Sequence, residues 1–264
     1  MGELLLCRGT DQKRVWNPMS DFSGWSWTLM AISAFFFGMS KTGIPGVGLL
    51  GVVIMATALP AKMSTGIVLP LLVLGDLFAI RYYHQTAEWR LLVRILPCAA
   101  LGVAAGAVAM HHTSDVQLRP IIGGISMGML LLNRLRLLQN KDAPPPALGW
   151  FSVVMGLIAG VTTMMANAAG PVMALYMLAL RLPKLAFLGT AAWAFLLLNL
   201  FKLPFSAGLG LIHPHSLMIN LCLAPLLVAG ALIGIRVARR IPEKPFAILV
   251  EAMAFAGAIM LLAR

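Results

Sequence analysis

Long apolar runs separated by short polar segments dominate the chain. Five stretches of at least 19 residues contain no Asp, Glu, Lys or Arg: 22–40, 42–61, 95–114, 143–180 and 203–235. Several of them reach the roughly 20 residues that a helix needs to cross the core of a bilayer. The runs are continuous and lack the ten-residue alternation of a membrane barrel strand. The pattern therefore predicts an all-α polytopic membrane protein.

The same runs define a similar series of elements in each half of the chain. Each half begins with an interrupted apolar segment, and three ordinary spans follow. In the first half these elements are 24–58, 64–83, 90–110 and 117–138, and in the second half they are 148–180, 185–203, 214–236 and 245–263. The predicted domains are a polar N-terminal segment (1–21), a first transmembrane repeat (22–138), a proline-rich linker (139–146) and a second transmembrane repeat (147–264).

Recurring spacings of proline and glycine indicate that the second half repeats the first, because a fixed offset is the mark of an internal duplication. One spacing of six and ten residues occurs twice, 123 residues apart, in Pro60, Gly66 and Asp76 and again in Pro183, Gly189 and Asn199. Another, of five and four residues, occurs in Pro97, Gly102 and Gly106 and again in Pro225, Gly230 and Gly234.

The interruption near residue 40 divides the first segment into two short arms. As helices, residues 24–38 and 46–58 would be about 22 and 20 Å long, short of the roughly 30 Å hydrocarbon core. A re-entrant hairpin that enters and leaves at one face fits these lengths, and a single broken span is the alternative. With a hairpin, each half makes three crossings, so the second repeat is inverted relative to the first.

The charge distribution agrees with this topology. The net charge is +11, and only 11% of residues are charged. The basic residues are spread through short loops, without the basic patch of a nucleic-acid-binding protein. In the hairpin topology eleven Lys and Arg lie on one face and seven on the other. The positive-inside rule places the eleven, with the linker, in the cytoplasm and both termini in the periplasm.

The two interruptions carry the candidate binding chemistry. A helix break frees backbone N–H groups and presents a positive helix N-terminus, which attracts anions. Paired breaks in inverted repeats mark the substrate site of secondary transporters. The candidate substrate-binding residues are Ser40, Lys41, Thr42, Gly43 and Gly46 in the first break and Thr162, Thr163, Asn167 and Gly170 in the second. The alternative for Lys41 is that it extends to the membrane interface and touches no substrate.

Further polar residues lie inside the predicted spans. Asp76 and its repeat partner Asn199 are candidates for coupling transport to a proton or another cation, because intramembrane carboxylates often serve that purpose. The alternative is a structural hydrogen bond between helices. Lys202, one turn after Asn199, could face the site or extend outward. Three scattered cysteines predict no metal site, and the absence of nucleotide-binding and hydrolase motifs predicts neither a cofactor nor an enzyme.

Five segments carry a family resemblance: "GMSKTGIPG", "LPLLVLGDLFAIRYY", "AEWRLLVRILPCAALGVAAG", "GVTTMMANAAGPVMALYML" and "FLGTAAWAFLLLNLFKLPFS". They resemble the TauE/SafE sulfite exporter family, and the resemblance covers about residues 25–262. It implies a permease of the bacterial inner membrane for small sulfur anions such as sulfite or organosulfonates. A secondary transporter working as an exporter is the expected function, and an anion channel or an importer of another small carboxylate or sulfur oxyanion is the alternative. The sequence is compatible with both a monomer and a homo-oligomer.

Overall fold

The computed structural model describes residues 22–59, 61–112, 127–128, 131, 148–167, 169–212 and 214–262. Within these ranges the regular structure is helical. The elements are α1 (Gly24–Thr42), α2 (Val47–Ala58), α3 (Ala61–Tyr83), the 3-10 helix η1 (His84–Thr86), α4 (Trp89–His112), α6 (Leu148–Ala166), α7 (Ala169–Ala179), α8 (Lys184–Gly208), α9 (Pro214–Arg240) and α10 (Glu243–Leu262). The predicted N-terminal segment, the linker and nearly all of the span 117–138 lie outside the described residues.

Four of the described helices are long and apolar enough to cross a membrane. Their spans are Gly66–Thr86, Trp89–Ala109, Lys184–Gly208 and Ser216–Arg240. They expose large apolar side chains, such as Leu77, Val93 and Leu221, as a surface in contact with lipid tails requires. The predicted class, an all-α polytopic membrane protein, is confirmed.

Each interrupted segment folds back on itself as a helical hairpin. In the first, a side chain on Gly48 would meet Ser40, and one on Gly51 would meet Phe37 and Ser33. Such contacts require α2 to run antiparallel to α1. In the second, the Ser152 and Tyr176 hydroxyls are 2.9 Å apart, which brings α7 back along α6. A single broken span would keep its arms in line, so the hairpin interpretation describes the observed backbone.

The first arm of the first hairpin is longer than predicted. Both α1 and α6 contain 19 residues, or about 28 Å of helix. We expected the first arm to end at Gly38, because glycine is a poor helix former. Gly38 lies within α1 and faces α9, where a Cβ would overlap the carbonyl oxygen of Leu227. Its lack of a side chain serves helix packing rather than helix termination.

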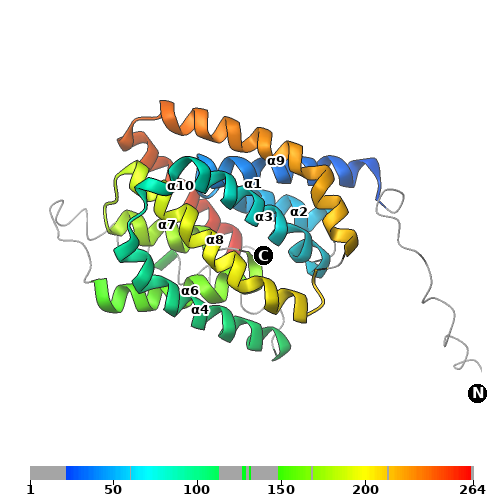
Figure 1. The fold of residues 1–264 in the computed structure, drawn as a ribbon, viewed down its shortest axis with the longest axis horizontal. Coiled ribbons are helices and arrows are strands. Elements are labelled where there is room, and N and C mark those ends of the chain that lie inside the picture. The colour runs from blue at the N-terminus through cyan, green and yellow to red at the C-terminus, as the bar shows by residue number, and fades with distance from the viewer. Residues whose placement is uncertain are drawn as a thin grey trace, which may run out of the picture.

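The first helix of each half packs against a long helix of the other half. Figure 1 shows α1 beside α9 along one edge of the molecule and α4 beside α6 along the opposite edge. A Cβ on Gly230 would overlap the Phe35 carbonyl of α1, and a Cβ on Gly102 would overlap the Leu157 carbonyl of α6. Small residues at four-residue spacing let membrane helices approach closely. The repeated glycine spacing therefore has a packing cause.

Helices α3 and α8 cross antiparallel between these two pairs. Gly66 in α3 packs against the backbone of Leu211, just after α8, and Gly189 in α8 packs against Tyr83 and Thr86, at the end of α3. Between these contacts, Asp76 and Asn199 meet. The two copies of the proline–glycine spacing thus occupy corresponding places in one helix crossing.

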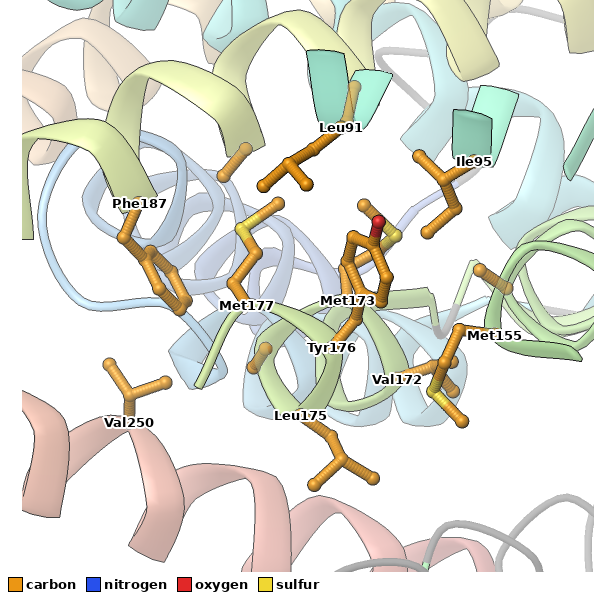
Figure 2. Close-up of a cluster of buried hydrophobic side chains, with 14 of the residues drawn as sticks. Leu91, Ile95, Met155, Val172, Met173, Leu175, Tyr176, Met177, Phe187 and Val250 are labelled. Carbon is orange, nitrogen blue, oxygen red and sulfur yellow. The ribbon is translucent and has the colours of Figure 1, made fainter. Parts of the chain in front are cut away.

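A cluster of buried apolar side chains encloses α7. Nine of its 11 residues are buried. Figure 2 shows Tyr176 and its neighbours in α7 surrounded by Leu91 and Ile95 of α4, Met155 of α6, Phe187 of α8 and Val250 of α10. Eleven residues give about 17 Å of helix, too short to span a bilayer. Contacts with four other helices hold this short helix inside the protein.

Candidate functional site

Both helix breaks line one cavity. Its volume is about 70 Å³, enough for several water molecules or one small oxyanion. The first break contributes Ser40, Lys41, Pro45, Gly46 and Gly48, and the second contributes Thr163, Asn167, Ala169, Gly170 and Pro171. Apolar side chains that include Phe37, Leu72, Met173 and Phe195 complete the wall. The cavity wall is therefore largely apolar, with polar groups contributed by the two breaks.

The backbone turns in a similar way at the two breaks. Gly46, the N-cap residue of α2, has a φ of 101°, and Asn167, shortly before α7, has a φ of 52°. Glycine adopts positive φ freely, and Asn tolerates it better than most residues. Each turn brings the N-terminus of a short helix to the cavity wall. The first N–H groups of a helix have no partner within that helix and carry a partial positive charge.

The prolines at the breaks differ in position. Proline suits the first turn of a helix, where its missing N–H removes no hydrogen bond within the helix. Pro171 is the third residue of α7, within its first turn, whereas Pro45 lies two residues before α2 begins at Val47. Both nonetheless line the cavity. Pro171 lacks one N–H at the α7 end, so Ala169 and Gly170 carry the remaining first-turn N–H groups that have no partner within α7.

The Lys41 side chain points into the protein rather than toward the surface. Its Nζ lies 2.8 Å from Oδ1 of Asp76, and the Lys41 side chain is only 10% exposed. The ammonium also lies 4.3 Å from the ring centroid of Phe195, a cation–π distance. Its place in the last turn of α1 stabilises the negative end of that helix. Lys41 therefore places a positive charge at the cavity wall, and its contacts with Asp76 and Phe195 fix the position of that charge.

Asp76 is fully buried and is held at both carboxylate oxygens. Oδ1 pairs with Lys41, and Oδ2 accepts a hydrogen bond of 2.7 Å from Nδ2 of Asn199. Asn199 lines the cavity, whereas Asp76 lies behind it. An unpaired carboxylate inside a membrane is costly, and these two contacts offset that cost.

Lys202 lies inside the protein beneath the second break. The side chain is fully buried, and Nζ donates a 2.8 Å hydrogen bond to the Thr163 carbonyl oxygen. Nζ also donates to Oδ1 of Asn167. An ammonium has no acceptor atom, so the Asn167 amide must turn its oxygen to Lys202 and keep its NH₂ for other partners. Sequence reasoning left Lys202 undecided, although its place one turn after Asn199 on the same helix face was a signal.

Comparison with protein families identifies the chain. The family model described as sulfite exporter TauE/SafE matches residues 30–261, a range that includes both breaks, Asp76 and Lys202. The protein belongs to the TauE/SafE family. The resemblance found in its motifs is thereby confirmed. Searches of curated proteins and of solved structures gave no match.

Family membership and the helices together define the general class of this TauE/SafE protein. It is a multi-pass membrane protein, and the family is one of transporters rather than enzymes. Sulfur anions are the substrates that the family description indicates. Lys41 and residues at the N-termini of α2 and α7 line the cavity between the breaks.

Three of the predicted substrate-binding residues in the TauE/SafE chain do not line the cavity. The Thr42 hydroxyl donates to the carbonyl oxygens of Gly38 and Ala231, at 3.1 and 2.7 Å. Gly43 caps α1 and packs against Gly234. The Thr162 hydroxyl donates to the Ala159 carbonyl, at 3.0 Å. Threonine in a membrane helix commonly bonds to backbone carbonyls in this way. Ser40, Lys41, Gly46, Thr163, Asn167, Gly170 and Asn199 do line the cavity.

Proposed function

We propose that this TauE/SafE protein is a secondary transporter that exports small sulfur-containing anions, such as sulfite or organosulfonates, and binds them between the two helix breaks. One observation carries the proposal: the N-termini of α2 and α7 and the ammonium of Lys41 line the same cavity. A helix N-terminus is equivalent to about half a positive charge. Two such ends with an ammonium suit an oxyanion.

Inverted repeats are part of the proposal, and two features of the packing support them. The corresponding helices α3 and α8 cross antiparallel, as an axis in the membrane plane requires. The pairs α1 with α9 and α6 with α4 exchange partners between the halves. A site where such repeats meet can open to either side when one repeat rocks against the other. This supports a transporter with alternating access over a fixed channel.

The proposed location is the bacterial inner membrane, with both termini in the periplasm and the linker 139–146 in the cytoplasm. Support comes from the excess of Lys and Arg on the linker side. Arg236, Arg239 and Arg240, near the end of α9, belong to that excess and are exposed. Fusion of a compartment-specific reporter after Arg264 tests the orientation. A reporter active in the cytoplasm would contradict it.

Asp76 supplies a route for cation coupling within the same proposal. In the structure its carboxylate forms an ion pair with the Lys41 ammonium. A proton on Asp76 would remove this competing charge and leave Lys41 available to an anion. Anion binding and protonation would then favour each other, which is the requirement for coupled movement of both.

Anion affinity of a Lys41 variant tests the proposed site. The measurement is calorimetry of purified protein with sulfite and methanesulfonate, alongside a melting curve of each variant. Lys41→Ala should weaken binding at least tenfold, or about 1.4 kcal/mol, because it removes the ammonium at the wall. Lys41→Arg should retain part of the affinity, since a guanidinium keeps the charge but not its shape. Lys244→Ala, at an exposed lysine, is the control. Unchanged affinity in a folded Lys41→Ala protein would contradict the proposal.

A further inference from the structure

We propose that the buried charges around the cavity select anions with a single negative charge, and that Lys202 supplies the positive charge that such an anion neutralises. The inference rests on the proposed function and adds the charge class of the substrate. Its basis is the set of charged side chains that the fold places in the interior, together with the partners that each of them has.

Three charged side chains surround the cavity. Asp76 and Lys202 are fully buried, and Lys41 is 10% exposed. Lys41 and Asp76 form an ion pair at 2.8 Å, so their charges cancel. Lys202 has two neutral acceptors within the described part of the chain, the Thr163 carbonyl and the Asn167 amide oxygen. With Asp76 as a carboxylate and Lys202 as an ammonium, the group as a whole carries one positive charge in excess.

The other described charged side chains do not change this count. Those whose side-chain burial the structure describes are exposed, except Lys184 and Glu251, which are partly buried. Lys184 donates to the carbonyls of Ala238 and Ile241, at 2.9 and 2.7 Å, at the end of α9 and away from the cavity lining. Glu251 has an interaction of its own in the structure and does not line the cavity.

A single excess charge discriminates between anions of the same shape. Electrostatic interactions are much stronger in a low-dielectric interior than in water. With Asp76 ionised, a monoanion brings the group of Lys41, Asp76, Lys202 and ligand to zero net charge. A dianion leaves one negative charge uncompensated or requires Asp76 to take up a proton, and either costs free energy that the monoanion does not. The wild-type site should therefore prefer the monoanion.

Lys202 acts as a positioning residue rather than as a direct ligand. It does not line the cavity, whereas its partners Thr163 and Asn167 do. Its ammonium holds Oδ1 of Asn167, which leaves the Asn167 NH₂ as a donor. Loss of Lys202 would therefore remove both an oriented donor and the excess charge.

A pair of anions that are alike in shape tests the charge match. Methanesulfonate is a monoanion, and sulfate, with a similar tetrahedral outline, is a dianion at neutral pH. The experiment measures the affinity of both by calorimetry for the full chain in lipid nanodiscs. Wild type should bind methanesulfonate at least tenfold more tightly than sulfate. Lys202→Met should weaken methanesulfonate binding at least tenfold, whereas Lys244→Met should leave both affinities unchanged.

Two substitutions of nearly constant volume change the charge in opposite directions. Asp76→Asn raises the net charge of the group by one, so the methanesulfonate-to-sulfate affinity ratio should move toward sulfate by at least tenfold. Asn167→Asp lowers it by one, because the new carboxylate would face the Lys202 ammonium, and should weaken methanesulfonate binding at least tenfold, which keeps the test open if Lys202→Met fails to fold. A merely structural role for these residues would lower both affinities without moving the ratio.

The outcomes separate this inference from the proposed function. Sulfate binding to wild type as tightly as methanesulfonate would overturn the charge match and leave an anion site in place. An unchanged affinity ratio in a folded Asp76→Asn protein would do the same. No binding of sulfite, methanesulfonate or sulfate to folded wild type would overturn the proposed function, and the charge match with it.

Discussion

The two helix breaks share a backbone arrangement but differ in their polar chemistry. Each follows a helix of 19 residues and precedes a short helix whose N-terminus lines the cavity. Each contains one residue with positive φ, Gly46 or Asn167. The first break has its own ammonium, Lys41 of α1, whereas the second receives one from α8, Lys202.

This difference separates positions that build the fold from positions that give the site its charge. Counted from Gly38 and Gly160, which both pack against a helix of the other half, Lys41 corresponds to Thr163. Asp76 corresponds to Asn199. Glycine occurs in both halves where helices touch, whereas the charged residues each occur in one half. In the proposed duplication, the two halves thus share their packing positions but not their charged residues.

The largest expected effect comes from substituting the glycines that pack against another helix in both halves. A Cβ on Gly38 would overlap the Leu227 carbonyl, and one on Gly160 the Ala99 carbonyl. Gly38→Ala and Gly160→Ala should each cost about 2–3 kcal/mol through overpacking, a fall of roughly 4–12 °C in melting temperature. The measurement is a thermal unfolding curve in detergent.

Gly149→Ala in α6 is the matched control, because nothing lies within 4 Å of the added Cβ. It should leave the melting temperature unchanged or raise it, since alanine favours helix. If Gly38→Ala and Gly160→Ala behave like this control, the helices are not in the close contact described, and the packing interpretation of the repeat is wrong.

The next effect concerns the carboxylate that distinguishes α3 from α8. If Asp76 couples transport to a proton, Asp76→Asn should still bind methanesulfonate but should not accumulate it against a gradient in proteoliposomes. The amide cannot exchange a proton in the working pH range. Glu243→Gln, at an exposed carboxylate of α10, is the control. Accumulation by Asp76→Asn at the wild-type level would assign Asp76 a structural role.

The smallest effect concerns neutral donors of the second break. Asn167→Ala should weaken anion binding by roughly two- to tenfold, because a neutral hydrogen bond contributes about 0.5–1.5 kcal/mol. Thr162→Ala should leave the affinity unchanged, since Thr162 donates to the Ala159 carbonyl and does not line the cavity. Calorimetry of the two variants with the same anion decides. Equal losses in both would mean that the second break contributes no specific donor.

The general architecture could be predicted from the sequence because membrane helices leave a strong local signal. Uncharged runs located the helices, and the glycine, proline and polar residues near Lys41 and Asn167 located both breaks. The sequence predicted the first hairpin because its two predicted arms, 24–38 and 46–58, are too short to span a bilayer. Gly38 misled the prediction of the first arm, because a glycine that ends a helix and one that lets another helix approach look alike in a single sequence.

The detailed site depended on which way each side chain points. Neighbouring residues on a helix face different directions, so Lys41 reaches the cavity while Thr42 bonds to the backbone of α9. The place of Lys202 depended on a contact between α8 and a break that lies 35 residues earlier in the chain. The repeated spacing aligned Asp76 with Asn199, but it did not indicate that these two residues touch each other.

Protection of two cysteines by one ligand tests most directly whether a single anion lies between both breaks. Ser40→Cys on α1 and Gly170→Cys on α7 both place a thiol at the cavity wall, and Gly170 has room for a side chain. Each is made in a chain whose native Cys7, Cys98 and Cys222 are replaced by Ser. The rate of labelling by an uncharged maleimide is measured as methanesulfonate is added. The account predicts that both thiols are protected with the same half-saturating concentration. Protection of only one thiol, or two different half-saturating concentrations, would contradict a shared site.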